Sequence, residues 1–443
     1  MGSRSGAGRG IVIGLFGCLA FAPGALATTR YAEPMGNGPE PCLQSNPCDL
    51  QLAVEGTVSL PVHNGDEVVV LPGDYSYGNN AGADLEITHA INVHGAVGQP
   101  RPRILTGAGE GVHVAVDGAK VSDLTIVGSG SLAALYVSAG SAERVYARVV
   151  GAGSNAACFV TNGLIRDSVC WNSSPTRGDA INLTRTGGLA SVTLRNVTAV
   201  STAPTDSYGG RFTADNGGTA HVDAKNVIFD GTTGDVRATA DATSNNEVII
   251  AHSNFADSTQ SGSVTLTAAG TPTNQVAPPA FVDPAHGDFR ELAASPTVDG
   301  GTTDAFVGLT DLEGDARSLG PAPDIGADEL IPGVDPVDPV DPVDPVDPTG
   351  PRDTTAPETT IDKAPKAKSR RRKARLEFTS SEPGSTFECR FDKAEFSACT
   401  SPLKRKLKRG RHRFEVRAID PAGNVDLAPA AVSWKVKRRH RHR

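Results

Sequence analysis

A polar residue recurs at the same place in six similar segments in the middle of this 443-residue chain. Each recurrence lies between two short runs in which apolar and polar residues alternate, and successive recurrences are 21, 23, 29, 30 and 26 residues apart. The six residues are Asp123, Arg144, Asp167, Asn196, Asn226 and His252. An irregular period of this length, with hardly any helical periodicity, predicts one turn of a β-solenoid per repeat.

Single repeats of this kind cannot fold alone. Each has two or three predicted strands of three to five residues, so its Val, Ile, Leu and Ala side chains are buried only when neighbouring turns stack on it. Asn and Asp tolerate the left-handed backbone of a sharp corner, and stacked corners can share side-chain hydrogen bonds. We expect about seven or eight turns between Gly65 and Ala256, a rod about 35 to 40 Å long. The alternative is a two-sheet β-sandwich.

Motifs flank the predicted solenoid on both sides. The first is PCLQSNPCDLQLAV with GDEVVVLPGDY, where Val68 and Val70 share one face of a strand that ends at Pro72-Gly73. The second is FVDPAHGDFRELAASPTVDGG (281–301) with DLEGDARSLGPAPDIGADEL (311–330). The key residues of this second motif are Asp288, Ser295, Pro296, Asp299, Gly300, Gly314, Arg317, Gly320, Asp324, Ile325, Gly326, Ala327 and Glu329.

Through these motifs, residues 40 to 331 resemble secreted bacterial right-handed parallel β-helix proteins of the pectate-lyase-like superfamily. The second motif is similar to the closing segment of the choice-of-anchor Q group within that superfamily. The resemblance implies the fold and an extracellular location, and much less about activity.

Two further regions follow the solenoid domain, which we place at residues 28–331. Residues 332–352 repeat Asp-Pro five times with a period of three, which predicts a polyproline II stalk about 60 Å long. Residues 353–436 show alternating strands and a predicted hairpin from Phe387 to Cys399. With the TTAPETTI opening and the RAIDPAGNVD turn, this part resembles small immunoglobulin-like domains of actinobacterial surface proteins. Residues 437–443 form a basic tail.

The first 27 residues have the features of a secretory signal peptide. Arg4 and Arg9 precede an apolar run from Ile11 to Ala22, and Ala25-Leu26-Ala27 is a small-x-small cleavage site. A lipoprotein processing box ending at Cys18 is an alternative, which the bulky Phe16 disfavours. No other run approaches about 18 apolar residues, so we expect no transmembrane segment. The sequence therefore predicts a secreted protein, extracellular or associated with the cell wall.

The cysteines agree with export. After cleavage the chain keeps six, in three close pairs, and none has the CxxC spacing of a zinc or redox site. We expect three short-loop disulfides, each stabilising the domain by about 2 to 4 kcal/mol. The pairs are Cys42 with Cys48, Cys158 with Cys170, and Cys389 with Cys399.

Candidate catalytic groups are scattered. A polysaccharide lyase needs carboxylates that hold calcium and a basic group, and a glycoside hydrolase needs two carboxylates about 5 to 10 Å apart. The candidates are Asp167, Asp179, Asp206, Arg211, Asp215, Asp223 and Asp230, among which no two aspartates are adjacent in the sequence. Catalytic residues therefore stay unknown. We expect no metal site and no cofactor, and we consider Ca²⁺ only for the case that the protein is a lyase.

Charge divides the chain. Residues 353–443 carry 24 Lys and Arg against 11 Asp and Glu, whereas residues 1–352 carry 18 against 39. Such a basic end favours binding to a polyanion, although a merely solubilising surface is the alternative. The candidate polyanion-binding residues are Arg370, Arg371, Arg372, Lys373, Lys404, Arg405, Lys406, Lys408 and Arg409.

These observations predict an all-β protein, a parallel β-helix followed by a small immunoglobulin-like sandwich. We expect non-catalytic binding or adhesion to a polysaccharide or an anionic cell-envelope polymer, with retention by the basic domain. The expected state is a monomer without sequence-specific nucleic-acid binding. The alternatives are a lyase or hydrolase acting on an acidic polysaccharide, and a purely structural surface spacer.

Overall fold

All six recurring polar residues adopt a left-handed backbone in the computed structural model. Their φ angles are 58° for Asp123, 48° for Arg144, 49° for Asp167, 52° for Asn196, 55° for Asn226 and 48° for His252. Five of them bend a strand without interrupting it, so pairs of short predicted strands form continuous strands of 9 to 13 residues. The predicted corners are confirmed, and the left-handed backbone lets the chain turn sharply at each of them.

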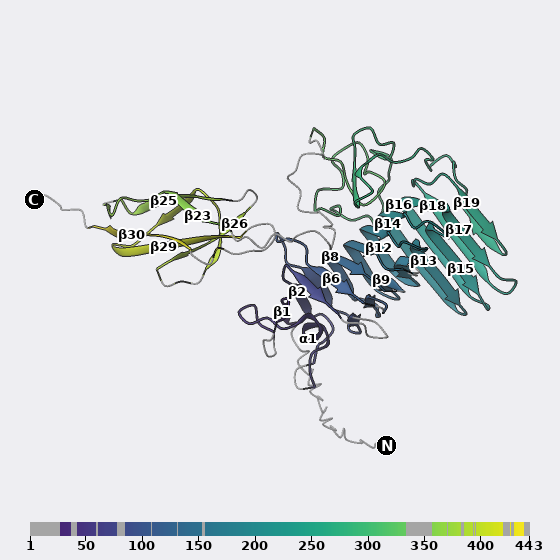
Figure 1. The fold of residues 1–443 in the computed structure, drawn as a ribbon, viewed down its shortest axis with the longest axis horizontal. Helices are drawn as coiled ribbons and strands as arrows, with labels where there is room; N and C mark the ends of the chain where they lie inside the picture. The colour runs from purple at the N-terminus through teal and green to yellow at the C-terminus, as the bar shows by residue number, and fades with distance from the viewer. Residues whose placement is uncertain are drawn as a thin grey trace, which may run out of the picture.

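The parallel strands form a β-solenoid of about seven turns (Figure 1). One side is an eight-stranded sheet, which contains β4 (Leu85–Ile87), β7 (Val112–Val114), β9 (Ala133–Val137), β11 (Ala156–Val160), β13 (Asp179–Thr186), β15 (Tyr208–Asp215), β17 (Gly234–Ala240) and β19 (Ser258–Ser261). The long corner-containing strands belong to a twelve-stranded sheet. It contains β1 (Thr29–Ala32), β2 (Glu67–Val70), β3 (Asp74–Ser76), β5 (Asn92–Gly95), β6 (Arg103–Thr106), β8 (Lys120–Gly128), β10 (Ser141–Val149), β12 (Asn162–Asn172), β14 (Leu189–Ser201), β16 (Thr219–Gly231), β18 (Asn245–Ala251) and β20 (Val264–Leu266).

Inward-facing side chains of successive turns form one core. Val68 and Val70 of β2 are fully buried, as their alternation predicts. Further along the axis, the rings of Phe212, Phe229 and Phe255 pack edge to face at 6.2 and 6.5 Å. Each such side chain contributes about 1.5 to 3 kcal/mol through burial.

The first end of the solenoid is covered by α1 (Leu50–Glu55). Asp49 caps this helix by accepting a hydrogen bond from the Leu52 amide at 2.9 Å. The helix buries Leu50, Ala53 and Val54, and thereby shields the first turn from water. It follows directly after the first disulfide.

Beyond β20 the chain turns back along the solenoid. The hairpin of β21 (Phe281–Asp283) and β22 (Asp288–Glu291) is followed by irregular chain up to residue 333, which we call the closing segment together with the hairpin (281–333). It packs on the twelve-stranded sheet, where Phe289 meets Trp171 edge to face at 5.6 Å. Gly287 lies so close to Trp171 that a Cβ there would be 2.3 Å from the ring, and its carbonyl accepts a hydrogen bond from Tyr146.

The C-terminal domain is a small β-sandwich. Its strands are β23 (Thr359–Lys363), β24 (Lys368–Ser369), β25 (Lys373–Ser380), β26 (Thr386–Phe391), β27 (Ser397–Cys399), β28 (Leu403–Lys406), β29 (Gly410–Ile419) and β30 (Ala430–Val436). One sheet has the order β23-β25-β28 and the other β24-β30-β29-β26-β27, and both supply side chains to a core around Leu376, Phe378, Phe414 and Trp434. The predicted hairpin is β26 with β27.

All three predicted disulfides are present. Their Cα–Cα distances are 5.0 Å for Cys42–Cys48, 5.7 Å for Cys158–Cys170 and 5.8 Å for Cys389–Cys399. The second joins β11 of one sheet to β12 of the other within the solenoid core.

The structure describes residues 27–36, 42–58, 61–77, 85–107, 109–130, 132–152, 156–333, 357–369, 371–381, 385–392, 394, 396–419, 426 and 429–437. The predicted signal peptide up to residue 26, the Asp-Pro linker after residue 333 and the tail after Lys437 lie outside the described residues. Within the described part of the chain, no helix is long and apolar enough to cross a membrane.

Candidate functional site

A continuous row of side chains crosses the outer face of the eight-stranded sheet, and all of them except the buried Asn182 are partly exposed. Their residues pair directly from strand to strand, and each alternates with buried residues of the core. We call it the outer row, and its members are His113, Tyr136, Phe159, Asn182, Arg211 and Arg237. At about 4.8 Å per strand, the row is about 24 Å long.

Aromatic rings occupy the first half of the outer row. The rings of His113 and Tyr136 stack at 4.2 Å with an angle of 9° between their planes, and Phe159 meets Tyr136 edge to face at 5.1 Å. The His113 Nε2 lies 2.7 Å from the hydroxyl of Ser138, and burial lowers the pKa of His113. This half therefore offers an aromatic platform, at whose outer end the carboxylates of Glu86 and Glu110 lie 3.6 and 3.9 Å from the His113 Nδ1.

Two arginines occupy the second half. Arg211 is held by two carboxylates, because its Nε donates to Asp179 at 2.8 Å and its Nη2 donates to Asp206 at 2.7 Å. The Arg211 guanidinium also lies over the ring of Tyr208, 4.6 Å from its centre, and its hydrogen bond lowers the pKa of Asp206. Arg211 is thus rigidly placed at the surface.

Arg237 is placed differently. It lies next to Arg211 in the strand register, 5.6 Å from the centre of the Tyr208 ring, and it donates to the Tyr208 hydroxyl at 3.4 Å. No carboxylate of the described residues forms an ion pair with it. Two adjacent guanidinium groups, one of them without a carboxylate partner among the described residues, form a surface that can receive an external anion.

Most carboxylates considered for catalysis have structural partners. Asp167 binds Arg317 under the closing segment, and Asp223 binds Arg195 of the twelve-stranded sheet at 2.6 Å. Asp179 also accepts hydrogen bonds from the Asn182 amide group and the Tyr208 backbone amide. The structure therefore brings Asp179, Asp206 and Arg211 together and places Asp167 and Asp223 elsewhere.

Two aspartates near the arginine half of the row have raised pKa values. Burial raises the pKa of Asp230 and of Asp235, which precedes Arg237 by two residues. Asp235 accepts hydrogen bonds from the backbone amides of Gly231 and Ala256, which fixes the turn at this edge of the sheet. Asp235 was not among the candidates from the sequence.

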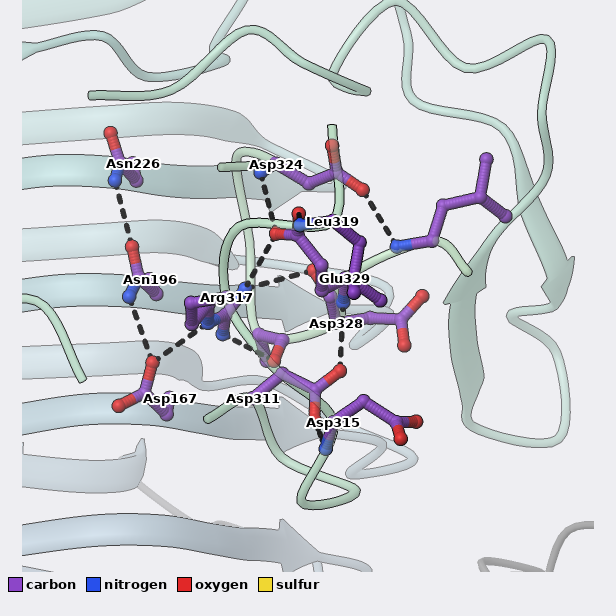
Figure 2. A network of polar contacts seen from close by, with 12 residues as sticks. Asp167, Asn196, Asn226, Asp311, Asp315, Arg317, Leu319, Asp324, Asp328 and Glu329 are labelled. Carbon is purple, nitrogen blue, oxygen red and sulfur yellow. Dashed lines mark hydrogen bonds and ion pairs between the residues drawn. The ribbon is translucent and has the colours of Figure 1, made fainter. Parts of the chain in front are cut away.

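The densest polar network holds the closing segment to the solenoid corners (Figure 2). The side-chain amides of Asn226 and Asn196 and the carboxylate of Asp167 form a ladder, in which Asn226 donates to Asn196 at 2.7 Å and Asn196 donates to Asp167 at 2.8 Å. At its end the buried Arg317 donates to Asp167 at 2.9 Å and to the carbonyls of Ala327 and Asp328.

In the closing segment, buried carboxylates accept the backbone hydrogen bonds that carbonyl groups accept in helices and sheets. Asp311 accepts from the amides of Asp315 and Glu329, and Glu329 accepts from the amide of Asp324 at 2.9 Å. Asp324 in turn accepts from the amide of Leu330 at 2.7 Å. The acidic residues of the closing motif thus satisfy the backbone donors of an irregular chain.

Three acidic side chains of the same network lie close together. Asp311, Glu313 and Asp328 have carboxylate oxygens within 4.8 Å of one another, and they could supply oxygen ligands to a hard cation. Burial raises the pKa of Asp311 to about 6 and that of Asp328 to about 7. This grouping was not foreseen, because Asp328 lies at the opposite end of the motif 311–330 from Asp311 and Glu313, and only the folded segment brings them together.

The predicted polyanion-binding residues gather in the C-terminal domain. Strands β25 and β28 are antiparallel, and their pairing brings Lys373 opposite Lys406. Arg371 and Arg372 precede β25, while Lys408 and Arg409 follow β28, and all four are exposed. Arg372 also donates to the Leu407 carbonyl, and Arg405 lies over the Phe391 ring at 4.9 Å. Arg370 lies outside the described residues.

No protein-family model matches the chain, and no curated protein matches it either. The resemblance to the pectate-lyase-like superfamily and its choice-of-anchor Q group therefore stays a prediction from the motifs. What the structure establishes is the parallel β-solenoid, the disulfides and the small antiparallel sheets of the C-terminal domain.

Proposed function

We propose that the solenoid binds an acidic polysaccharide along the outer row, as a secreted protein of the pectate-lyase-like kind. The observation that carries this proposal is the order of the row, in which a stacked aromatic half is followed by two adjacent arginines. Aromatic faces pack against the apolar faces of sugar rings, and planar guanidinium groups bind carboxylates in a bidentate manner. A chain of sugars with carboxylate groups would match both halves at once.

Binding is favoured over cleavage because the best-placed carboxylates are occupied. Asp179 makes its hydrogen bonds within the protein, and the lowered pKa of Asp206 suits an ion-pair partner rather than a proton donor. The second candidate function is a lyase or hydrolase, which the raised pKa values of Asp230 and Asp235 would support. The third candidate, a spacer without ligands, does not account for the outer row.

Isothermal titration of residues 28–443 with polygalacturonate, and with dextran as the neutral polymer, tests the proposal. We expect binding to polygalacturonate, at least fivefold weaker for Tyr136→Ala and for Arg237→Gln. His221→Ala is the matched control, since His221 is a half-exposed ring on β16 of the other sheet. Equal loss in all three variants, or no binding to either polymer, would contradict the proposal.

The same samples distinguish binding from catalysis. Release of unsaturated or reducing sugar ends from polygalacturonate by the unmodified protein would establish the enzyme instead. Assays with added Ca²⁺ and with a chelator are both needed, because a lyase of this kind requires calcium.

A further inference from the structure

One end of the C-terminal sandwich collects the ends of five strands. β24 and β30 end there, β28 ends there, and β25 and β29 begin there, as their pairings show. We call it the basic end, and its exposed cations are Lys368, Arg371, Lys373, Lys406, Lys408, Arg409, Arg411, Lys435 and Lys437. In Figure 1, β30 leads toward the label C at this end.

Like charges face each other across strands at the basic end. Lys373 pairs with Lys406 between β25 and β28, and Lys435 lies between Arg411 of β29 and Lys368 of β24. None of these five forms an ion pair with a carboxylate of the described residues. Like charges directly opposite each other destabilise a sheet, so an external anion that neutralises them gains that energy on binding.

Several cations elsewhere in the domain form ion pairs with carboxylates of the domain itself. Arg413 pairs with Glu415 at 3.0 Å, Arg417 pairs with Glu388 at 2.6 Å, and Lys363 lies 3.4 Å from Glu377. The chain enters the sandwich at the opposite end, where the Thr359 amide donates to Asp426. The domain is therefore polarised, and its uncompensated end points away from the point of entry.

We propose that the basic end binds a linear phosphodiester polymer other than a nucleic acid, and so attaches the protein to an anionic surface. The two non-bridging oxygens of one phosphate group can each bind one of two cations that lie about 5 Å apart on neighbouring strands. Among the described residues of this domain, no large apolar side chain is fully exposed, which gives nothing to insert into a lipid layer. Nor does an exposed aromatic ring accompany the cations, as stacking of nucleic-acid bases would require.

Binding of residues 28–443 to poly(glycerol phosphate), measured by fluorescence anisotropy over a range of NaCl concentrations, tests this site. We expect Lys373→Gln/Lys406→Gln to bind about tenfold more weakly at low salt, with the slope of log K against log salt reduced by about 1 to 1.5. The control Lys363→Gln/Arg413→Gln removes the same charge from cations that already have partners. It should change the affinity less than twofold.

Several outcomes would overturn the proposal. They are absence of binding at low salt, an equal loss in the control variant, and tighter binding to duplex DNA or to phosphatidylglycerol vesicles than to the polymer. Circular dichroism of both double variants separates loss of binding from loss of folding. Titration with polygalacturonate reports on the outer row in the same variants, so the two proposals can fail independently.

Discussion

Asn196 shows how one side chain serves both the backbone and the stacking of a solenoid corner. Its φ of 52° is a conformation that Asn tolerates better than other residues, and its side chain is fully buried. Its amide group donates to Asp167 and accepts from Asn226, so that three turns are joined through one residue. The backbone conformation and the side-chain hydrogen bonds of this residue can therefore be tested by separate substitutions.

We therefore expect Asn196→Ala to destabilise the solenoid by about 2 to 4 kcal/mol, from unsatisfied ladder partners and backbone strain. Asn196→Gly loses the same hydrogen bonds but accepts the positive φ, and should be about 0.5 to 1 kcal/mol less destabilised than the alanine variant. Urea denaturation followed by circular dichroism measures both. A glycine variant that is less stable than the alanine variant would show that strain at the corner is unimportant.

At the level of elements, corners were predictable and the outer row was not. Corner residues carry their signal locally, because Asn and Asp stand out between alternating strands. Members of the outer row follow their corners by 11 to 15 residues, so Tyr136, Phe159 and Arg237 show no fixed period in the sequence. Their alignment depends on the lengths of the intervening turns, which only the packed coil determines. The sequence did single out Arg211 as a charged candidate residue, but it did not indicate which residues lie beside it in the outer row.

The closing segment is the element most sensitive to pH. Burial raises the pKa of Glu329 from 4.5 to about 7, so the folded protein keeps this proton over a range in which the unfolded chain loses it. Its contribution to stability is complete below about pH 4.5 and is lost as the pH rises through about 7. Burial raises the pKa values of Asp311 and Asp328 as well, so their contributions to stability have the same pH dependence.

Stability against urea should therefore fall by about 1 to 2 kcal/mol per group between pH 5 and pH 8. Glu329→Gln keeps an oxygen that accepts from the Asp324 amide but has no proton to lose. It should flatten this pH dependence and narrow the difference between pH 5 and pH 8. Asp288→Asn is the control at an ion pair on the outer part of the same segment. An unchanged slope in Glu329→Gln would assign the pH dependence to other groups.

On the scale of the whole molecule, the hydrophobic core of the C-terminal sandwich is separate from that of the solenoid. The buried residues of the solenoid core run from Ala32 to Phe255, and a smaller cluster around Trp171 and Phe289 joins the closing segment to the solenoid. The C-terminal core draws only on residues from Ile361 to Val436. Two of the disulfides lie in the solenoid domain and the third lies in the sandwich. Charge follows the same division, with the acidic residues concentrated in the solenoid and the uncompensated cations in the sandwich.

Calorimetry of residues 28–443 should accordingly show two unfolding transitions that respond to different substitutions. Arg317→Gln removes the buried guanidinium that pairs with Asp167 at 2.9 Å and should lower only the solenoid transition, by about 3 to 5 kcal/mol. Cys389→Ser/Cys399→Ser opens the β26–β27 hairpin and should lower only the sandwich transition, by about 2 to 4 kcal/mol. Arg177→Gln, at an exposed position, should move neither. If one substitution shifted both transitions, the two cores would be energetically coupled, and attachment through the sandwich would then alter the solenoid as well.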